Sequence, residues 1–182
     1  MACGIFDVLG RKDNALMLVK PEGVKYSHII LKYLDGHSYK PMRAPVDLQL
    51  TMDQVRQIYN RLTVEDPTWN PEPYWTHMTS KKSELLFLHY DVEQNDIPDA
   101  QVLLKKLCGH SYPPTADLNS LRHALNKPLQ DEFVSLEVID PNVDNGSYVL
   151  NGVHVAENFK KADEECKIML GVSFNDYLAK DI

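Results

Sequence analysis

Short apolar segments typical of β-strands are spread along the chain. Residues 15–19 and 85–90 are nearly continuous apolar runs, as expected for buried strands. Residues 46–50 alternate between apolar and polar positions, which is typical of a half-buried strand. Residues 148–153 give a further apolar segment of the same kind. The sequence therefore predicts four strands.

Between these segments, apolar residues recur at the spacing of an α-helix. Residues 27–34 carry one such stripe. A second helix begins at Thr51-x-Asp53-Gln54, which has the pattern of a capping box. Residues 63–73 are rich in proline and polar residues and are predicted to form a loop. The apolar face of the second helix consists of Val55, Ile58, Tyr59 and Leu62.

Two more helices complete the pattern. Pro98 marks the start of a helix that runs through Leu107, with Gly109 as its C-cap, and a polar helical run from Glu157 follows the last strand. The resulting order, βαββαβ, is that of a ferredoxin-like fold. The sequence therefore predicts an α+β fold, an antiparallel sheet with helices on one face, plus an inserted hairpin. The fold class alone implies no function.

Composition and charge narrow the class of protein. The chain has 182 residues, of which 43% are hydrophobic, and this fits one domain over residues 1–182. A formal net charge of -7 argues against a nucleic-acid coat, so no specific nucleic-acid partner is expected. The three cysteines lack metal-ligand spacing and are interpreted as reduced thiols. The apolar runs are too short for a membrane span, and a cytoplasmic setting is predicted.

One histidine lies in a context that suits phosphate chemistry. Asn151-Gly-Val-His154 ends a predicted strand, just before a helix opened by an acidic residue. Backbone N–H groups and the helix dipole favour phosphate at such a position. A lone histidine is more often structural, so further motifs must support the interpretation. The other histidines show no zinc-ligand spacing and are interpreted as surface or core residues: His28, His37, His77, His89, His110 and His123.

Four motifs in order resemble those of the nucleoside diphosphate kinases. Residues 20–24, Lys-Pro-Glu-Gly-Val, are similar to the family's Lys-Pro-Asp-Gly-Val, and Asn151-x-x-His154 is similar to its active-site Asn-x-x-His. Residues 105–113 resemble Arg-x-x-x-Gly-x-Thr-x-Pro, and Leu121-Arg122 corresponds to Ile-Arg. The order and spread of the motifs across the chain make the resemblance specific.

The resemblance implies a role for each matching residue. His154 corresponds to the histidine that becomes phosphorylated, and Glu165 to the glutamate that hydrogen-bonds its far ring nitrogen. Pro73-Tyr74-Trp75 resembles Pro-Phe-Phe, which makes Tyr74 the expected base-stacking ring. The catalytic set is thus His154, Glu165 and Lys20, and no protein metal ligand is expected. The nucleotide-binding set is Lys20, Tyr59, Tyr74, Lys105, Ser111, Arg122 and Asn151.

The chain departs from the family at three places. Lys105 stands where the family has arginine, so a point charge replaces a bidentate fork. Ser111 replaces threonine and keeps the hydroxyl. Residues 155–158, Val-Ala-Glu-Asn, replace Gly-Ser-Asp-Ser and remove a supporting serine hydroxyl, so turnover is expected to be slower.

The resemblance implies a ping-pong kinase that passes the γ-phosphate of ATP to nucleoside diphosphates through His154. Lys20, Lys105 and Arg122 would supply the positive charge, and Mg²⁺ would arrive with the nucleotide phosphates. A homo-oligomer is expected. The alternative is a catalytically weak nucleotide-binding or interaction protein that retains the fold. A nuclease or nucleic-acid regulator would need a basic face, which the composition does not favour.

The segment 126–146 is longer than the family leads one to expect. Residues 133–139 have a strand-like composition, and Asp144-Asn145-Gly146 is a strong turn signal. These features predict a β-hairpin beside the strand that carries His154. Its apolar residues favour a role in subunit packing, and a solvated decoration is the alternative.

Overall fold

The computed structural model describes residues 13–65, 72–92, 99–110, 116–135 and 151–180. Within this part of the chain, five strands form one antiparallel sheet in the order β2-β4-β1-β5, with β3 also paired to β4. The strands are β1 (Asn14–Val19), β2 (Tyr39–Pro41), β3 (Val46–Leu48), β4 (Ser83–Tyr90) and β5 (Val153–His154). The α+β class with an antiparallel sheet is as predicted.

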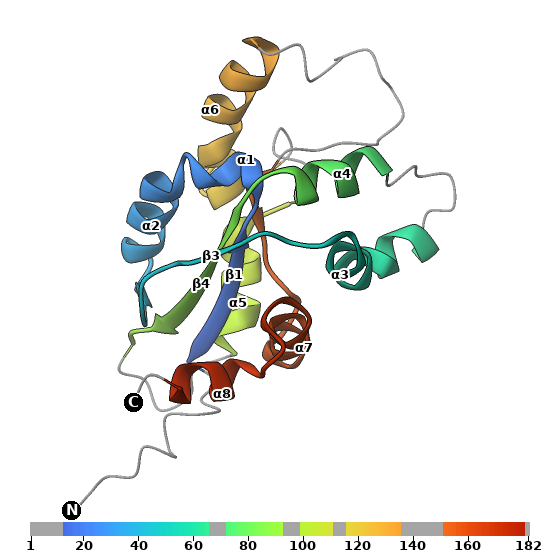
Figure 1. Cartoon of the computed structure of the whole chain (residues 1–182). Helices are drawn as coiled ribbons and strands as arrows, with labels where there is room; N and C mark the ends of the chain where they lie inside the picture. The colour runs from blue at the N-terminus through green and yellow to red at the C-terminus, as the bar shows by residue number, and fades with distance from the viewer. Residues whose placement is uncertain (1–12, 66–71, 93–98, 111–115, 136–150, 181–182) are drawn as a thin grey trace, which may run out of the picture.

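Eight helices surround the described part of the sheet (Figure 1). The first four are α1 (Pro21–Val24), α2 (Ser27–Asp35), α3 (Met52–Glu65) and α4 (Glu72–Ser80). The other four are α5 (Ala100–Cys108), α6 (Leu121–Ser135), α7 (Phe159–Leu170) and α8 (Phe174–Ala179).

Helices cover both faces of the sheet, whereas the sequence predicted them on one face. All six residues of β1 are buried, and its side chains alternate between two apolar clusters. Met17 belongs to the cluster that includes buried residues of α2, α5 and α6, and Leu18 belongs to the cluster that includes buried residues of α3, α4, α7 and α8. A continuous apolar run, rather than an alternating one, is what burial on both faces requires.

Local signals placed several helix ends correctly. Gln54 and Thr51 form the predicted reciprocal cap of α3, with Thr51 N–H donating to Gln54 Oε1 at 2.9 Å. The start of α5 was not predicted in this way: Asp99, which the sequence did not single out as a cap, caps the helix by accepting from the amides of residues 101 and 102. Gly109 ends α5 with a φ of 77°, a conformation that favours glycine.

The predicted loop at residues 63–73 is wrong at both ends, because α3 continues through Glu65 and α4 begins at Glu72. Pro73 lies in the first turn of α4, where a helix tolerates proline because no N–H is needed there. Tyr74 and Met78, four residues apart, then form the buried face of α4.

The strand predicted at residues 133–139 is also wrong where it can be compared, because residues 133–135 belong to α6. Leu121, Leu125 and Leu129 are buried at four-residue spacing, and this stripe favours a helix. The rest of the predicted hairpin, with the turn at Asp144-Asn145-Gly146, lies outside the described residues. So do residues 148–150 of the predicted last strand.

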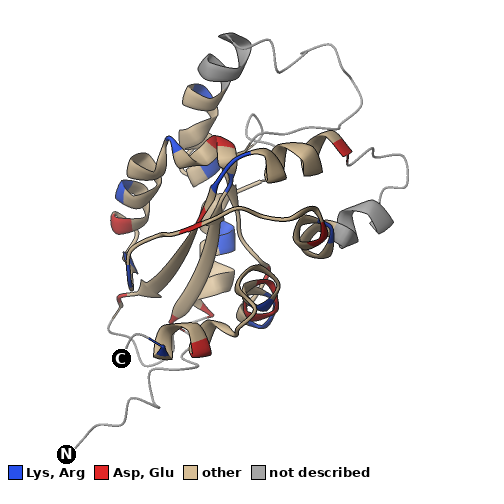
Figure 2. Cartoon of the chain, in the orientation of Figure 1, with Lys and Arg blue, Asp and Glu red and all other residues tan. Residues whose placement is uncertain are grey.

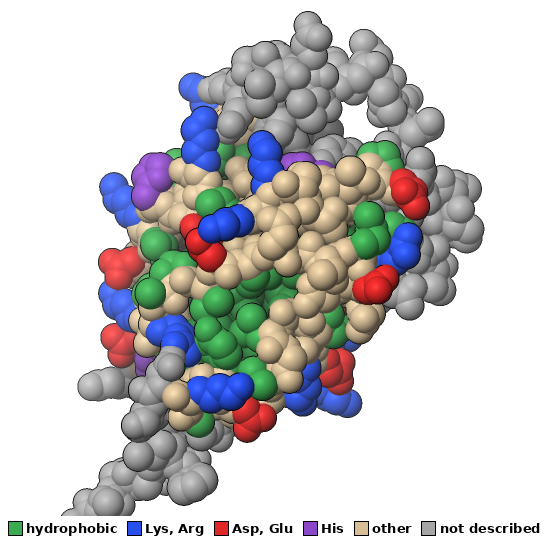
Figure 3. All heavy atoms as spheres, viewed as in Figure 1, with side chains coloured by type: hydrophobic (Ala, Val, Ile, Leu, Met, Phe, Trp, Pro, Cys, Tyr) green, Lys and Arg blue, Asp and Glu red, His purple; other side chains and the backbone are tan. Residues whose placement is uncertain are grey.

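Charged side chains are spread over the helices (Figure 2), whereas apolar side chains gather at the centre of one face (Figure 3). Acidic and basic residues are interspersed over the helices that are drawn in colour (Figure 2). The face seen in Figure 3 is hollowed at its centre, where hydrophobic side chains gather and charged ones border them. Among the described residues, no helix has the length and apolar character needed to cross a membrane.

Candidate active site

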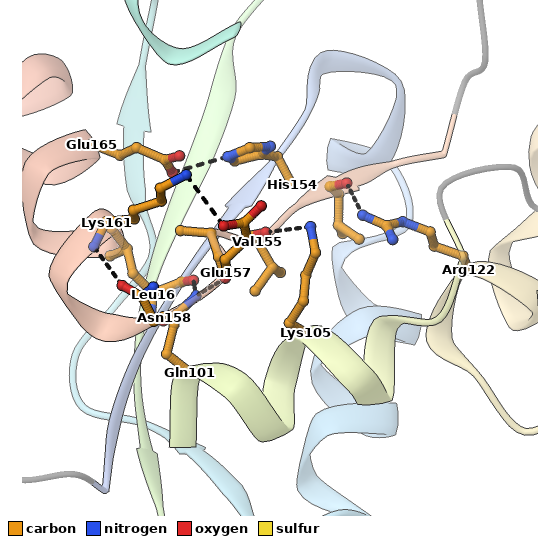
Figure 4. A network of polar contacts seen from close by, with 12 residues as sticks. Leu16, Gln101, Lys105, Arg122, His154, Val155, Glu157, Asn158, Lys161 and Glu165 are labelled. Atoms are coloured by element: carbon orange, nitrogen blue, oxygen red, sulfur yellow. Dashed lines mark hydrogen bonds and ion pairs between the residues drawn. The ribbon is translucent and has the colours of Figure 1, made fainter. Parts of the chain in front are cut away.

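The sheet and α7 together place His154. β5 pairs with β1 through Leu18 opposite His154 and Val19 opposite Val153. Asn158 caps α7 by accepting from Lys161 N–H at 3.0 Å, and Glu165 projects from this helix toward the histidine (Figure 4).

His154 and Glu165 meet through Nε2 of the ring and Oε2 of the carboxylate at 2.9 Å. An ionised carboxylate only accepts hydrogen bonds, so Nε2 carries the proton and Nδ1 keeps its lone pair. Both side chains are mostly buried, with exposed fractions of 18% and 15%. For a neutral imidazole, this arrangement favours one tautomer and leaves the lone pair on Nδ1.

Tyr59 and Tyr74 form an aromatic cluster with the ring of His154. The Tyr59 ring contacts the His154 ring edge-on at a centroid distance of 5.0 Å, and Tyr74 packs edge-on against Tyr59 at the same distance. Burial raises the pKa of the Tyr59 hydroxyl, which therefore stays protonated. Tyr74, the expected base-stacking residue, is only 6% exposed and packs as a core side chain.

Lys20 lies at the junction of β1 and α1. Its ammonium donates to Asn151 Oδ1 at 2.7 Å, lies 5.2 Å from the centroid of the Tyr74 ring, and is buried. Its backbone N–H donates to Gly152 O at 2.9 Å. The pKa of Lys20 is lowered to about 8: burial is the largest cause, the Glu22 charge opposes it, and the Arg122 and Lys105 charges add to the lowering.

Lys105 and Arg122 donate to the carbonyls on either side of His154 (Figure 4). The Lys105 ammonium lies 2.8 Å from Val155 O, and burial lowers its pKa. Arg122 reaches Val153 O at 3.3 Å and Gly109 O at 2.5 Å. The Arg122 Nε atom is buried and has no hydrogen-bond partner among the described residues. Two cations thus lie against the backbone that carries the histidine.

Residues that the sequence gave no reason to select support this backbone. Gln101, fully buried on α5, bonds both the N–H and the C=O of Leu16 and also donates to Ala156 O at 3.3 Å. Asp99 caps α5 with one carboxylate oxygen and accepts from Phe159 N–H at the start of α7 with the other. Gln101 shares the buried face of α5 with Ala100, Leu104 and Cys108, and a polar residue on such a face is the sequence signal that marks this role.

Glu22 and His77 were also missed as a pair. The buried Glu22 carboxylate accepts from His77 Nε2 at 2.8 Å and from Gly152 N–H at 3.2 Å. Burial raises the pKa of Glu22, but the His77 hydrogen bond and the Lys20 charge outweigh it and hold the pKa below its usual value. His77 was interpreted from the sequence only as a surface or core residue, because its separation from Glu22 by 55 positions forms no motif.

The structure brings together most of the residues selected from the sequence. Ser111 lies outside the described residues. No group of three or more histidine, cysteine or acidic side chains suited to a metal occurs within the described ranges. The residues that lie around one region are Lys20, Tyr59, Tyr74, Lys105, Arg122, Asn151, His154 and Glu165.

Comparison of the sequence with protein-family models and with curated proteins gives no match. Solved structures, in contrast, share the fold. The nucleoside diphosphate kinase from Encephalitozoon cuniculi is similar with a TM-score of 0.59 at 18% identity, covering 92% of this chain and 98% of that chain. The enzyme from Pyrobaculum aerophilum has a TM-score of 0.56 at 14% identity, covering 86% of this chain and 94% of its own.

A nucleoside diphosphate kinase family protein from Babesia bovis gives a TM-score of 0.56 at 20% identity and covers 86% of each chain. At these identities the likeness shows the fold. The chain therefore has a fold similar to that of nucleoside diphosphate kinases, and its activity must be argued from its own residues.

Proposed function

We propose that this protein is a nucleoside diphosphate kinase in which His154 carries the phosphoryl group between two nucleotides. The observation that carries the proposal is the 2.9 Å contact between His154 Nε2 and Glu165, which leaves Nδ1 with its lone pair. A neutral imidazole held in one tautomer suits nucleophilic attack on a phosphorus atom.

The chemistry balances in two half-reactions. Nδ1 of His154 attacks the γ-phosphorus of ATP, a P–N bond forms, the bond to the bridging oxygen breaks, and ADP leaves. A second nucleoside diphosphate then attacks the phosphohistidine with a β-phosphate oxygen, the P–N bond breaks, and a nucleoside triphosphate leaves. The imidazole returns to its starting tautomer after each cycle.

Three cations support a role in charge neutralisation, which is the main requirement of phosphoryl transfer. Lys20 lies between β1 and α1, where its ammonium donates to Asn151, while Lys105 and Arg122 bond the carbonyls that flank His154. The buried Nε of Arg122, which has no hydrogen-bond partner within the described part of the chain, is a donor that a phosphate oxygen would satisfy. Mg²⁺ would enter as part of the nucleotide substrate, and assembly into a homo-oligomer remains a prediction from the sequence.

Initial-rate kinetics test the proposal. With ATP varied at several fixed concentrations of a nucleoside diphosphate, a phosphoenzyme intermediate gives parallel double-reciprocal lines, because each half-reaction releases its product before the next substrate binds. Intersecting lines would contradict the covalent route. Nucleotide binding without measurable transfer would instead support the alternative, a weakly active binding protein that retains the fold.

A further inference from the structure

Glu22 links three parts of the site that are far apart in the sequence. It lies on α1 and has a fully buried side chain. One carboxylate oxygen accepts from His77 of α4 at 2.8 Å, and the other accepts from Gly152 N–H at 3.2 Å. A buried carboxylate needs such partners, because an unpaired charge is costly to bury.

Residues 151 and 152 hold Lys20 through one backbone and one side-chain hydrogen bond. Gly152 O accepts from the Lys20 N–H at 2.9 Å, and Asn151 Oδ1 accepts from the Lys20 ammonium at 2.7 Å. Gly23 packs against Gly152 with no room for a side chain between them. The Glu22 carboxylate is therefore hydrogen-bonded to Gly152, whose carbonyl accepts from the Lys20 N–H. Gly152 lies two residues before His154.

We propose that His77 is a positioning residue for nucleotide binding: it holds the Glu22 carboxylate against Gly152 N–H and beside Lys20, and so keeps the Lys20 ammonium in place for a phosphate. His77 would not touch the substrate. This inference rests on the proposed function for its kinetic consequence, while its structural consequence for Lys20 stands independently.

The charges around Lys20 indicate how its pKa depends on Glu22 and therefore on His77. The charges that act on Lys20 are Glu22 of α1, Arg122 of α6 and Lys105 of α5; burial and both cations lower its pKa, and Glu22 alone raises it. Tyr74 of α4 contributes the face of its ring. Glu22 in turn is faced by His77 and Lys20.

Removal of His77 is expected to change the pKa of both Glu22 and Lys20. Without the His77 hydrogen bond, burial raises the pKa of Glu22, and the carboxylate is neutral for a larger fraction of the time. Lys20 then loses part of the negative charge that supports its ammonium, and its pKa falls. At neutral to mildly alkaline pH, fewer molecules carry the cation that binds phosphate.

The test compares His77→Ala with His77→Gln, whose amide keeps a donor, and with His28→Ala as a matched control. His28 is an exposed histidine on α2. The pKa of Lys20 is measured in each variant by NMR of lysine labelled with ¹³C at the ε position. We expect His77→Ala to lower this pKa measurably, and we expect His77→Gln and His28→Ala to stay close to the wild type.

Kinetics provide the second readout. His77→Ala should reduce kcat/KM about tenfold, mainly through KM, because a hydrogen bond to a charged group is worth about one such factor. His77→Gln should restore most of it. A merely structural role would lower the thermal midpoint without shifting the Lys20 pKa or the ratio of KM to kcat.

The outcomes separate this inference from the proposed function. An unchanged Lys20 pKa in His77→Ala overturns the inference, whatever the kinetics show. A wild-type protein that forms no phosphoenzyme overturns the proposed function, while the NMR comparison still decides whether His77 controls Lys20.

Discussion

Gly23 lies so close to Gly152 that a Cβ atom at Gly23 would be 2.2 Å from the Gly152 carbonyl oxygen. That oxygen is backbone and accepts from Lys20 N–H, so it cannot move without disturbing the site. The close contact joins the Lys-Pro-Glu-Gly-Val segment to the backbone that precedes His154. A glycine is required here by space rather than by its conformation.

Gly23→Ala should therefore destabilise the protein by about 1–3 kcal/mol or more, as overpacking does in tightly packed sites. Denaturant unfolding followed by circular dichroism measures this. Gly36→Ala is the matched control, because its nearest contact would be 3.5 Å away and its φ of -63° suits any residue. A Gly23→Ala protein as stable as the Gly36→Ala protein would show that the two segments are not in contact.

Arg122→Ala should reduce kcat/KM by about 10- to 100-fold, since a charge-assisted hydrogen bond to phosphate is worth about 1.5–3 kcal/mol. Lys105→Ala should have a smaller effect, because lysine contributes a single point charge. Steady-state assays with matched circular dichroism spectra compare the two. Near-neutral effects of both substitutions would mean that the phosphates bind elsewhere.

Glu165→Gln tests the tautomer of His154. The amide is nearly isosteric but also offers a donor, so the ring is no longer constrained to carry its proton on Nε2. The rate of phosphoenzyme formation should fall about tenfold or more in rapid-quench experiments, by loss of a hydrogen bond to a charged group. Glu164→Gln, next to it on α7, is the control and should retain the wild-type rate.

Activity should decline as the pH rises through about 8, where Lys20 loses its charge. The contribution of Lys20 to the free energy of unfolding changes with pH in the opposite direction to the activity. Between pH 8 and 10.5 the unfolded chain holds a proton that the folded chain has lost, so the Lys20 contribution to stability increases with pH. The decline is therefore not unfolding. Arginine keeps its charge in this pH range, so kcat/KM of Lys20→Arg should not decline as the pH rises through about 8. If the variant shows the same decline as the wild type, another group causes it.

The sequence predicted the α+β class, and the structure brings most of the selected site residues together. Lys20, Asn151 and His154 were selected because their motifs resemble those of the kinases, and the reciprocal cap at Thr51 and Gln54 depends only on neighbours. Such features are local. The unbroken apolar run of β1 indicated a buried strand, but the helices were predicted on one face, whereas two apolar clusters share the side chains of β1.

The sequence could not predict hydrogen bonds between residues that lie far apart along the chain. Nothing near His77 indicates that it bonds Glu22 from a different helix, and Gln101 bonds Leu16 across 85 positions. Residues 133–135 show the converse error: a β-prone composition gave a strand, whereas the apolar stripe upstream continues the helix to Ser135. Burial, which decides both cases, depends on packing between distant segments.

The phosphoenzyme itself is the most direct test of the account. The purified protein is incubated with γ-labelled ATP and Mg²⁺, and the protein-bound label is followed after treatment with acid or base. The account predicts label that is acid-labile and base-stable, that is lost on addition of a nucleoside diphosphate, and that is absent from His154→Ala. Label that survives acid, or that persists in His154→Ala, would contradict it.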